Sequence, residues 1–324
     1  TIAFADANAQ VEQLFPSSGA EFLVNTTTNN RQEEPSVASL SSGGFVITWH
    51  SNGQDGDSWG IYGQRYAADG SLQGSEFLVN TQTANRQSDP AVTGLSDGGF
   101  VVTWMSSQQD GDGYGIYGQR YGADGVTAGN EFLVNTYTNN SQEAPAVVGL
   151  SDGGFVVTWQ GHTDNEGGGG YGVTGQRYKA DGSIQGARFL VNSTWDDTQS
   201  TAAVDSVDGG GFVIVWQSAN TDGSSWGVYG QRYGADTSPQ GSEFLVNTQT
   251  TDSQQAPAVT GLSDGGFVVT WMSRNQDGDQ FGIYGQRYDI DGAATGNEFL
   301  VNTYTKDTQQ SPAVVGLSDG GFLI

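Results

Sequence analysis

The feature that most constrains this chain is an internal repeat of 55 residues. A Gly-Gly-Phe triplet recurs at spacings of 55, 55, 57, 55 and 55 residues, ending at Phe45, Phe100, Phe155, Phe212, Phe267 and Phe322. A Phe-Leu-Val-Asn motif keeps step with it from Phe22 to Phe299. Self-similarity at a fixed period of this length is typical of folds that repeat one supersecondary unit many times. The chain is therefore interpreted as six copies of one small unit.

Each copy contains four short runs that are typical of β-strands. In the second copy these runs are 91–95, 100–106, 115–121 and 131–135. They are rich in Val, Phe, Trp and Tyr, and clusters of Gly, Asp and Asn separate them. The Ser-Asp-Gly-Gly segment at 96–99 can supply the positive φ angles of a tight hairpin. The second run is apolar on both faces, which favours a sheet that is covered on both sides.

The two ends of the chain complete each other. The Gln-Arg-Tyr run occurs five times, whereas the other three runs occur six times, and the sequence stops at Ile324 inside a sixth second run. Residues 9–15, AQVEQLF, carry the pattern of the missing third run and precede the first Glu-Phe-Leu-Val-Asn motif. We therefore predict an all-β fold, a six-bladed β-propeller of four-stranded antiparallel blades. It forms one domain over 1–324, and its last blade is closed by 1–26 and 311–324 together.

Charge excludes several classes of partner. The chain has 324 residues, 11 basic against 36 acidic side chains, and a net charge of −25, which repels nucleic acids and anionic membranes. No apolar run approaches the roughly 20 residues that a membrane-spanning helix needs. We expect neither nucleic-acid binding nor membrane insertion. The chain has no Cys, so disulfides are excluded.

Strand parity places two chemically rich loops on the same face of each blade. These are the Gln-Asp-Gly-Asp loop between the second and third runs and the Asn-Thr-x-Thr loop that leads to the next blade. Loops on a rigid frame are where binding residues usually lie. Paired carboxylates at i and i+2 can converge on one hard cation, and Ca²⁺ prefers such oxygen ligands. The predicted Ca²⁺ ligands are Asp55, Asp57, Asp110, Asp112, Asp277 and Asp279. The alternative is an Asx turn that only shapes the loop.

Aromatic residues recur on the same predicted face. They begin the third run or follow the Phe-Leu-Val-Asn motif, at Trp59, Tyr114, Tyr171, Trp226, Phe281, Tyr137, Trp195 and Tyr304. Amide and hydroxyl groups beside an aromatic plate suit a sugar ring, so we predict these residues as ligand-binding. The alternative is that they cap the blades and exclude water.

The pattern also resembles a known class of repeats. The repeat covers essentially residues 21–324 and has the consensus G-x-EFLVNT, Q, PAV-x-GLSDGGFVVTW, QDGD, GIYGQRY-x-ADG. This consensus resembles repeats of large secreted bacterial proteins of the RTX, hemolysin-type calcium-binding and adhesin-like kind. The resemblance implies a secreted or bacterial cell-surface location and a calcium-rich setting. The nonapeptide GGxGxDxUx of that family is absent from this sequence.

Together these observations predict a multivalent extracellular binding or adhesion module that recognises carbohydrate through the QDGD and NTxT face. It would be a monomeric domain of a larger chain, with a glycan or a cell-surface protein as partner and with no cofactor apart from Ca²⁺. The alternative is a Ca²⁺-stabilised structural or protein-interaction spacer. A glycosidase is the third hypothesis, because the only histidines, His50 and His162, lie outside any repeated frame. We therefore expect a protein that is not an enzyme.

Overall fold

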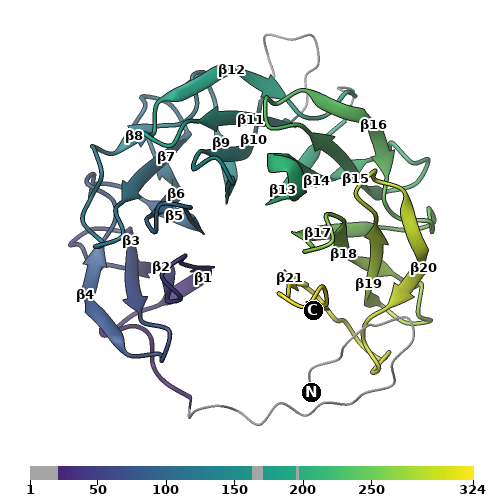
Figure 1. Ribbon diagram of the computed structural model, residues 1–324, viewed down its shortest axis with the longest axis horizontal. Coiled ribbons are helices and arrows are strands. Elements are labelled where there is room, and N and C mark those ends of the chain that lie inside the picture. The colour runs from purple at the N-terminus through teal and green to yellow at the C-terminus, as the bar shows by residue number, and fades with distance from the viewer. Residues whose placement is uncertain (1–20, 163–170, 195–196) are drawn as a thin grey trace. The chain divides into compact units, whose positions relative to one another are not determined.

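The structure is a computed structural model that describes residues 21–162, 171–194 and 197–324 (Figure 1). Within these residues, five sheets have four strands each and a sixth has two. In the first three sheets the strands are β1 Gln32–Ser39, β2 Phe45–Asn52, β3 Trp59–Tyr66, β4 Leu72–Leu78, β5 Gln87–Gly94, β6 Phe100–Ser107, β7 Tyr114–Tyr121, β8 Phe132–Leu133, β9 Gln142–Gly149, β10 Phe155–His162, β11 Tyr171–Tyr178 and β12 Ile184–Leu190.

The remaining sheets continue the same order. Their strands are β13 Gln199–Ser206, β14 Phe212–Ala219, β15 Trp226–Tyr233, β16 Pro239–Leu245, β17 Gln254–Gly261, β18 Phe267–Arg274, β19 Phe281–Tyr288, β20 Ala294–Leu300, β21 Val315–Gly316 and β22 Phe322–Leu323. A short 3-10 turn, Asp208–Gly210, joins β13 to β14. Neighbouring strands are consecutive in sequence and antiparallel. The predicted all-β class and the four-stranded antiparallel unit are confirmed.

The chain divides into two compact units. One unit comprises Glu21–His162 and Thr174–Phe189, and it holds the first two sheets and most of the third. The other comprises the described residues of Thr163–Val173 together with those of Leu190–Ile324. No helix in the described part of the chain is long and apolar enough to cross a membrane.

Within each unit the core lies between the faces of successive sheets. In β6 every residue from Phe100 to Ser106 is buried, and the Trp104 side chain is fully buried among Val46, Ile61 and Tyr117. Burying a large apolar side chain contributes about 1.5–3 kcal/mol. The prediction that the second strand is covered on both faces is therefore confirmed.

Glycine lets the hairpin between the first two strands approach the third strand. A Cβ atom on Gly99 would lie 2.2 Å from the carbonyl oxygen of Tyr121, and one on Gly266 would lie 2.3 Å from that of Tyr288. Because the obstacle is backbone, neither site has room for a side chain. The repeated Gly-Gly-Phe triplet thus reflects close backbone packing as well as turn geometry.

A bulge interrupts the first strand of each four-stranded sheet at one repeated position. In β1 the pairing with β2 shifts between Glu33 and Ser36, and Glu34 has φ 52°. In β5 the shift falls between Ser88 and Ala91, and Asp89 has φ 54°. The same left-handed φ recurs at Ala144, Thr201, Ala256 and Ser311. β-Bulges change the direction in which a side chain points, and they are frequent beside active sites.

Successive blades are joined by a repeated polar seam. The carboxylate of Glu131 accepts a hydrogen bond from the backbone N–H of Thr81 at 2.7 Å, and Glu76 accepts one from the N–H of Thr26 at 2.6 Å. The hydroxyl of Tyr66 donates to the carbonyl of Val24 at 3.5 Å. Residues 22–26 thus contact the first sheet as the end of a fourth strand contacts the next sheet.

Candidate active site

The bulges bring two carboxyl groups together that the other copies lack. Glu34 and Asp89 occupy the bulge position of β1 and β5, where later copies have Ala144, Thr201, Ala256 and Ser311. Strands β1 and β5 are neighbours within one unit. The first two copies are therefore chemically distinct at the one position where the backbone redirects a side chain.

His50 lies between these strands. Residue 50 pairs with Glu33 across the β1–β2 ladder, and its imidazole is fully buried. The His50 Nδ1 lies 3.3 Å from a carboxylate oxygen of Glu34, and the Nε2 lies 3.7 Å from one of Glu33. Each ring nitrogen thus faces a different carboxyl group.

Asp89 completes the group from the following sheet. One ligand atom from each of Glu34, His50 and Asp89 lies within 4.8 Å of the others. The repeat explains the approach of residues 50 and 89, because the equivalent residues also meet. The N–H of Ala144 lies 3.2 Å from the Met105 sulfur, and the N–H of Ala256 donates to the Gln217 amide oxygen at 2.9 Å. We call Glu33, Glu34, His50 and Asp89 the acid–histidine cluster.

The environment of the cluster changes the proton affinity of two of its members. A hydrogen bond with Asp89, burial, and the Asp89 charge raise the pKa of Glu34 to about 7, although the nearby Arg86 opposes this shift. Burial lowers the pKa of His50, and the carboxylates around it oppose that shift only in part. At neutral pH the cluster therefore combines a neutral imidazole with a carboxyl group that is half protonated.

Two arginines and a tryptophan border the cluster. The Arg31 guanidinium forms an ion pair with Glu33. The Arg86 guanidinium carbon lies 5.8 Å from the centre of the Trp59 ring, and that ring meets the His50 imidazole edge to face at 4.4 Å. The Arg86 Nε is buried and has no hydrogen-bond partner among the described residues. Both arginines are specific to the first two copies, because Ser or Thr follows at their position, in Ser141, Thr198, Ser253 and Thr308.

The paired aspartates of the QDGD loops have structural partners. The first Asp of each pair bonds within its own turn, where Asp110 accepts from the N–H of Asp112 at 3.5 Å. The second Asp reaches the loop that precedes the next sheet, where Asp57 and Asp112 accept from the N–H groups of Asn85 and Asn140 at 2.8 and 3.0 Å. These contacts are those of the alternative, an Asx turn that shapes the loop. Ca²⁺ binding by the six aspartates stays a prediction.

The predicted aromatic residues begin the third strand of each sheet. Trp59, Tyr114, Tyr171, Trp226 and Phe281 are the first residues of β3, β7, β11, β15 and β19, and each is half-buried. Tyr137 is half-buried and Tyr304 is exposed, whereas Trp195 lies outside the described residues. Of this set, Trp59 contacts the acid–histidine cluster. The remaining aromatic assignments stay predictions.

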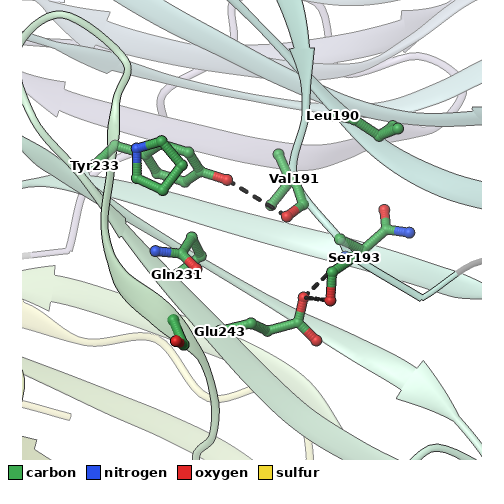
Figure 2. Close-up of a pocket in the computed structure, with 9 residues that line it drawn as sticks. Leu190, Val191, Ser193, Gln231, Tyr233 and Glu243 are labelled. Carbon is green, nitrogen blue, oxygen red and sulfur yellow. Dashed lines mark hydrogen bonds between the residues drawn. The ribbon is translucent and has the colours of Figure 1, made fainter.

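A cavity of about 530 Å³ lies in the second unit, between residues 190–193 and strands β15 and β16 (Figure 2). Figure 2 shows the Tyr233 hydroxyl directed at the carbonyl of Val191, at 3.4 Å, and Ser193 beside Glu243. Both the N–H and the hydroxyl of Ser193 donate to Glu243, at 2.9 and 3.0 Å. The single carboxylate of this cavity is thus engaged in the same seam that joins other blades. The acid–histidine cluster, with three carboxyl groups, is the stronger candidate site.

The sequence contained a signal for this cluster that the repeat pattern obscured. Alignment of the copies places Arg31, Glu33, Glu34, Arg86 and Asp89 on an otherwise weakly charged frame, and it places His50 where other copies have Met or Gln. The repeat pattern is defined by the residues that recur, and these residues do not recur.

Comparisons with known proteins identify the fold. No protein-family model matches the chain, and no curated protein matches it. Among solved structures, a protein of unknown function from Dyadobacter fermentans has a TM-score of 0.60 at 12% identity, covering 88% of this chain and 86% of that one. An α-L-arabinanase of Penicillium chrysogenum, complexed with arabinobiose, has a TM-score of 0.56 at 15% identity, covering 90% and 86%. An α-L-arabinofuranosidase of Fusarium graminearum, bound to an iminosugar inhibitor, has a TM-score of 0.55 at 12% identity, covering 90% and 87%.

At these identities the likeness shows a β-propeller fold, with the four-stranded sheets as its blades. The comparisons also overturn the prediction of a non-enzymatic adhesion module, because the characterised structures of this fold named above are carbohydrate-cleaving enzymes. The physical reason lies in the first two blades. A protonated carboxyl group beside a second carboxylate is suited to proton transfer, which a passive sugar-binding surface does not require.

Proposed function

We propose that the protein is a glycosidase-like enzyme whose active site is the acid–histidine cluster. The observation that carries the proposal is the convergence of three carboxyl groups on one buried imidazole at the bulges of β1 and β5. Glycoside hydrolysis requires two carboxyl groups with different roles, one as acid and one as base or nucleophile. The likeness to an arabinanase and an arabinofuranosidase supports a glycan substrate.

Glu34 is assigned as the general acid. Its carboxyl group is more than half exposed, so a substrate can reach it, and the pKa of about 7 keeps it largely protonated at mildly acidic pH. Transfer of its proton to the glycosidic oxygen lets the bond between that oxygen and the anomeric carbon break. Asp89 serves as a positioning residue, because its hydrogen bond is the largest cause of the raised pKa of Glu34.

Glu33 is assigned as the second carboxylate. It lies at the His50 Nε2 while Glu34 lies at the Nδ1, so the imidazole holds the two carboxyl groups apart. The Arg31 guanidinium forms an ion pair with Glu33. In this assignment Glu33 takes a proton from the water that adds to the anomeric carbon, while Glu34 supplies the proton of the departing alcohol. The net reaction is hydrolysis of the glycosidic bond.

The test uses a panel of chromogenic glycosides that includes α-L-arabinofuranosides, with purified protein and the variants Glu34→Gln and Glu33→Gln. We expect each variant to lose at least about a hundredfold in kcat/KM, the usual contribution of a positioned acid or base. Glu143→Gln is the matched control, because Glu143 occupies the position of Glu33 in the third blade and should keep full activity. Equal activity in the wild type and Glu34→Gln on every hydrolysed glycoside would refute the assignment.

The finer architecture is also a proposal. We infer a closed propeller of six blades in which residues 22–26 and the β21–β22 hairpin belong to one blade. The contacts of Val24 and Thr26 with Tyr66 and Glu76 support this, since they repeat those between the other fourth strands and the blades that follow. Cysteines placed at Leu23 and Ile324 test it by distance measurement between spin labels in solution. A short, narrow distance distribution is expected, and a broad one extending far beyond a blade's width would contradict closure.

A further inference from the structure

We propose that Glu34, His50 and Asp89 form a binding site for one divalent transition-metal cation of the Zn²⁺ or Mn²⁺ type. The binding itself stands on the geometry of these three residues. Its consequence for activity, given below, rests on the proposed function. The remaining described residues show no other group of three such side chains with ligand atoms this close together.

The buried imidazole is the first argument. The His50 side chain is fully buried, and neither ring nitrogen has a hydrogen-bond partner in the described structure. Buried polar groups in folded proteins almost always have partners, so an unpartnered one needs an explanation. The Nδ1 faces Glu34, and a cation between them would use its lone pair. A neutral imidazole is the form that binds metals.

The distances are the second argument. The three ligand atoms lie within 4.8 Å of one another, and the His50 Nδ1 already lies 3.3 Å from a Glu34 oxygen. Neighbouring ligands of a tetrahedral cation with bonds of about 2.1 Å are about 3.4 Å apart, so a contraction of at most about 1.4 Å at the carboxyl groups builds the site. One imidazole nitrogen with two carboxylate oxygens is a mixed set that suits Zn²⁺ and Mn²⁺ better than Ca²⁺.

The surroundings of His50 are the third argument. A metal-bound histidine almost always donates its second ring N–H to a carboxylate, a carbonyl or a water, which sets the tautomer and the ring orientation. The Nε2 of His50 faces the carboxylate of Glu33 at 3.7 Å, and Trp59 packs against the ring. The acid–histidine cluster thus contains the carboxylate of Glu33, the imidazole of His50 and the carboxyl groups of Glu34 and Asp89. Known sites use the same order, in which a carboxylate holds the imidazole and the imidazole binds the metal.

Arg86 is the main opposing group. Its positive charge acts on both Glu34 and His50, so it weakens the attraction of the site for a second cation. Arg86→Ser, which introduces the residue of the equivalent positions Ser141 and Ser253, should therefore tighten cation binding severalfold.

The cation and the catalytic proton would compete for the same carboxyl oxygens. If Glu34 is the general acid, then a metal bound to it removes the proton that the reaction needs, and the cation acts as an inhibitor. Glu33 lies at the other ring nitrogen and is not one of the three proposed ligands. The site would in this way make glycoside cleavage sensitive to the available transition metal.

Isothermal titration calorimetry of chelator-treated protein with ZnCl₂, and separately with MnCl₂, tests the proposal. Excess Mg²⁺ is kept in the buffer to occupy weak acidic surface sites. We expect one saturable site per chain for at least one of the two cations, weakened at least tenfold in His50→Met and in Asp89→Ala. Both variants install residues that the repeat already carries at these positions, in Met105, Met272, Ala144 and Ala256, and circular dichroism checks that they fold.

Glu143→Gln serves as the control for charge and should bind as the wild type does. The absence of a saturable site for either cation, or an unchanged affinity in folded His50→Met, would overturn the proposal. The two proposals can fail separately, because the titration does not depend on turnover. Cation binding without hydrolysis of any glycoside would remove the proposed activity and leave the metal site, whereas hydrolysis without cation binding would do the reverse.

Discussion

The contact between the first two blades and the contact between the fourth and fifth blades have the same backbone and different chemistry. In the first, His50 faces Asp89 across neighbouring sheets; in the second, Gln217 accepts a hydrogen bond from the N–H of Ala256 at 2.9 Å. Both contacts use the residue after the buried Trp and the residue at the bulge. The comparison teaches that the repeat sets the backbone positions of these two residues. A few substitutions at one pair of blades then convert a structural contact into a candidate catalytic one.

The largest effect is expected when the residues of the first contact are replaced by those of the second. The triple variant Glu34→Thr, His50→Gln and Asp89→Ala installs the equivalent residues of the fourth and fifth blades, Thr201, Gln217 and Ala256. We expect glycosidase activity to fall by at least about a hundredfold, because the general acid is removed. Melting temperature should change little, since equivalent residues already pack in the other contact. Activity assays and calorimetry on the same preparation measure both, and activity close to wild type would remove the cluster from catalysis.

A second test asks whether the backbone packs equally tightly in the second and fifth blades. Gly99→Ala and Gly266→Ala each place a Cβ against a carbonyl oxygen, at 2.2 and 2.3 Å. Forcing extra volume into a packed site costs about 1–3 kcal/mol, so both variants should lose stability by similar amounts. Urea denaturation monitored by tryptophan fluorescence measures the loss. Ala substitution at Gly111, around which the structure leaves open space but whose φ is 106°, separates backbone strain from overlap.

A third test uses pH to sharpen the chemical difference. Glu34 has a pKa raised from 4.5 to about 7, so it acts as an acid below that value, and activity should decline as pH rises through about 7. Asp89→Ala removes the largest cause of the shift and should move this alkaline limb to lower pH. The pH dependence of kcat/KM measures it. A limb that stays in place in Asp89→Ala would mean that Asp89 does not control the proton of Glu34.

The raised pKa of Glu34 also makes the stability of the folded protein depend on pH. The folded protein holds the Glu34 proton more tightly than the unfolded chain does, so this group contributes its full stabilisation below about pH 4.5 and loses it as pH rises through about 7. The effect of Asp89→Ala on stability should therefore differ between mildly acidic and alkaline buffer. Thermal unfolding at several pH values, with Ala256→Ser as a control at the equivalent bulge, tests this.

The smallest expected effect belongs to the seam that both contacts share. Glu131 accepts from Thr81 and Gln109, and Glu298 accepts from Thr248 and Gln276. Glu131→Gln keeps one acceptor oxygen and replaces the charge, so we expect a loss of about 1 kcal/mol or less, typical of a hydrogen bond near the surface. Glu298→Gln should behave alike. A loss several times larger in only one of them would show that the blades are not equivalent as structural units.

Much of the fold could be predicted from the sequence because its determinants recur. Strand and turn chemistry appear at the same spacing in every copy, so local ambiguity in one copy was resolved by the others. The second strand was predicted at 100–106 and is observed at Phe100–Ser107. The fourth was predicted at 131–135, but β8 covers only Phe132–Leu133, whereas the equivalent strands β4, β12, β16 and β20 have seven residues each.

The candidate site could not be predicted in the same way. A repeat emphasises what copies share, whereas catalysis uses what one pair of copies does not share. His50 lies outside the repeated frame, so the repeat pattern alone assigns it no role. The approach of Asp89 to His50 also depends on a bulge, and the pairing shift between Ser88 and Ala91 is not visible in a pattern of alternating residues.

The left-handed bulge has a consequence for the design of new proteins. It recurs at Ala144 and Ala256, where small uncharged side chains have the same backbone conformation as Glu34. The residue equivalent to His50 already lies beside each of them, Met105 beside Ala144 and Gln217 beside Ala256. Single substitutions at these positions would introduce further reactive groups without any change to a loop.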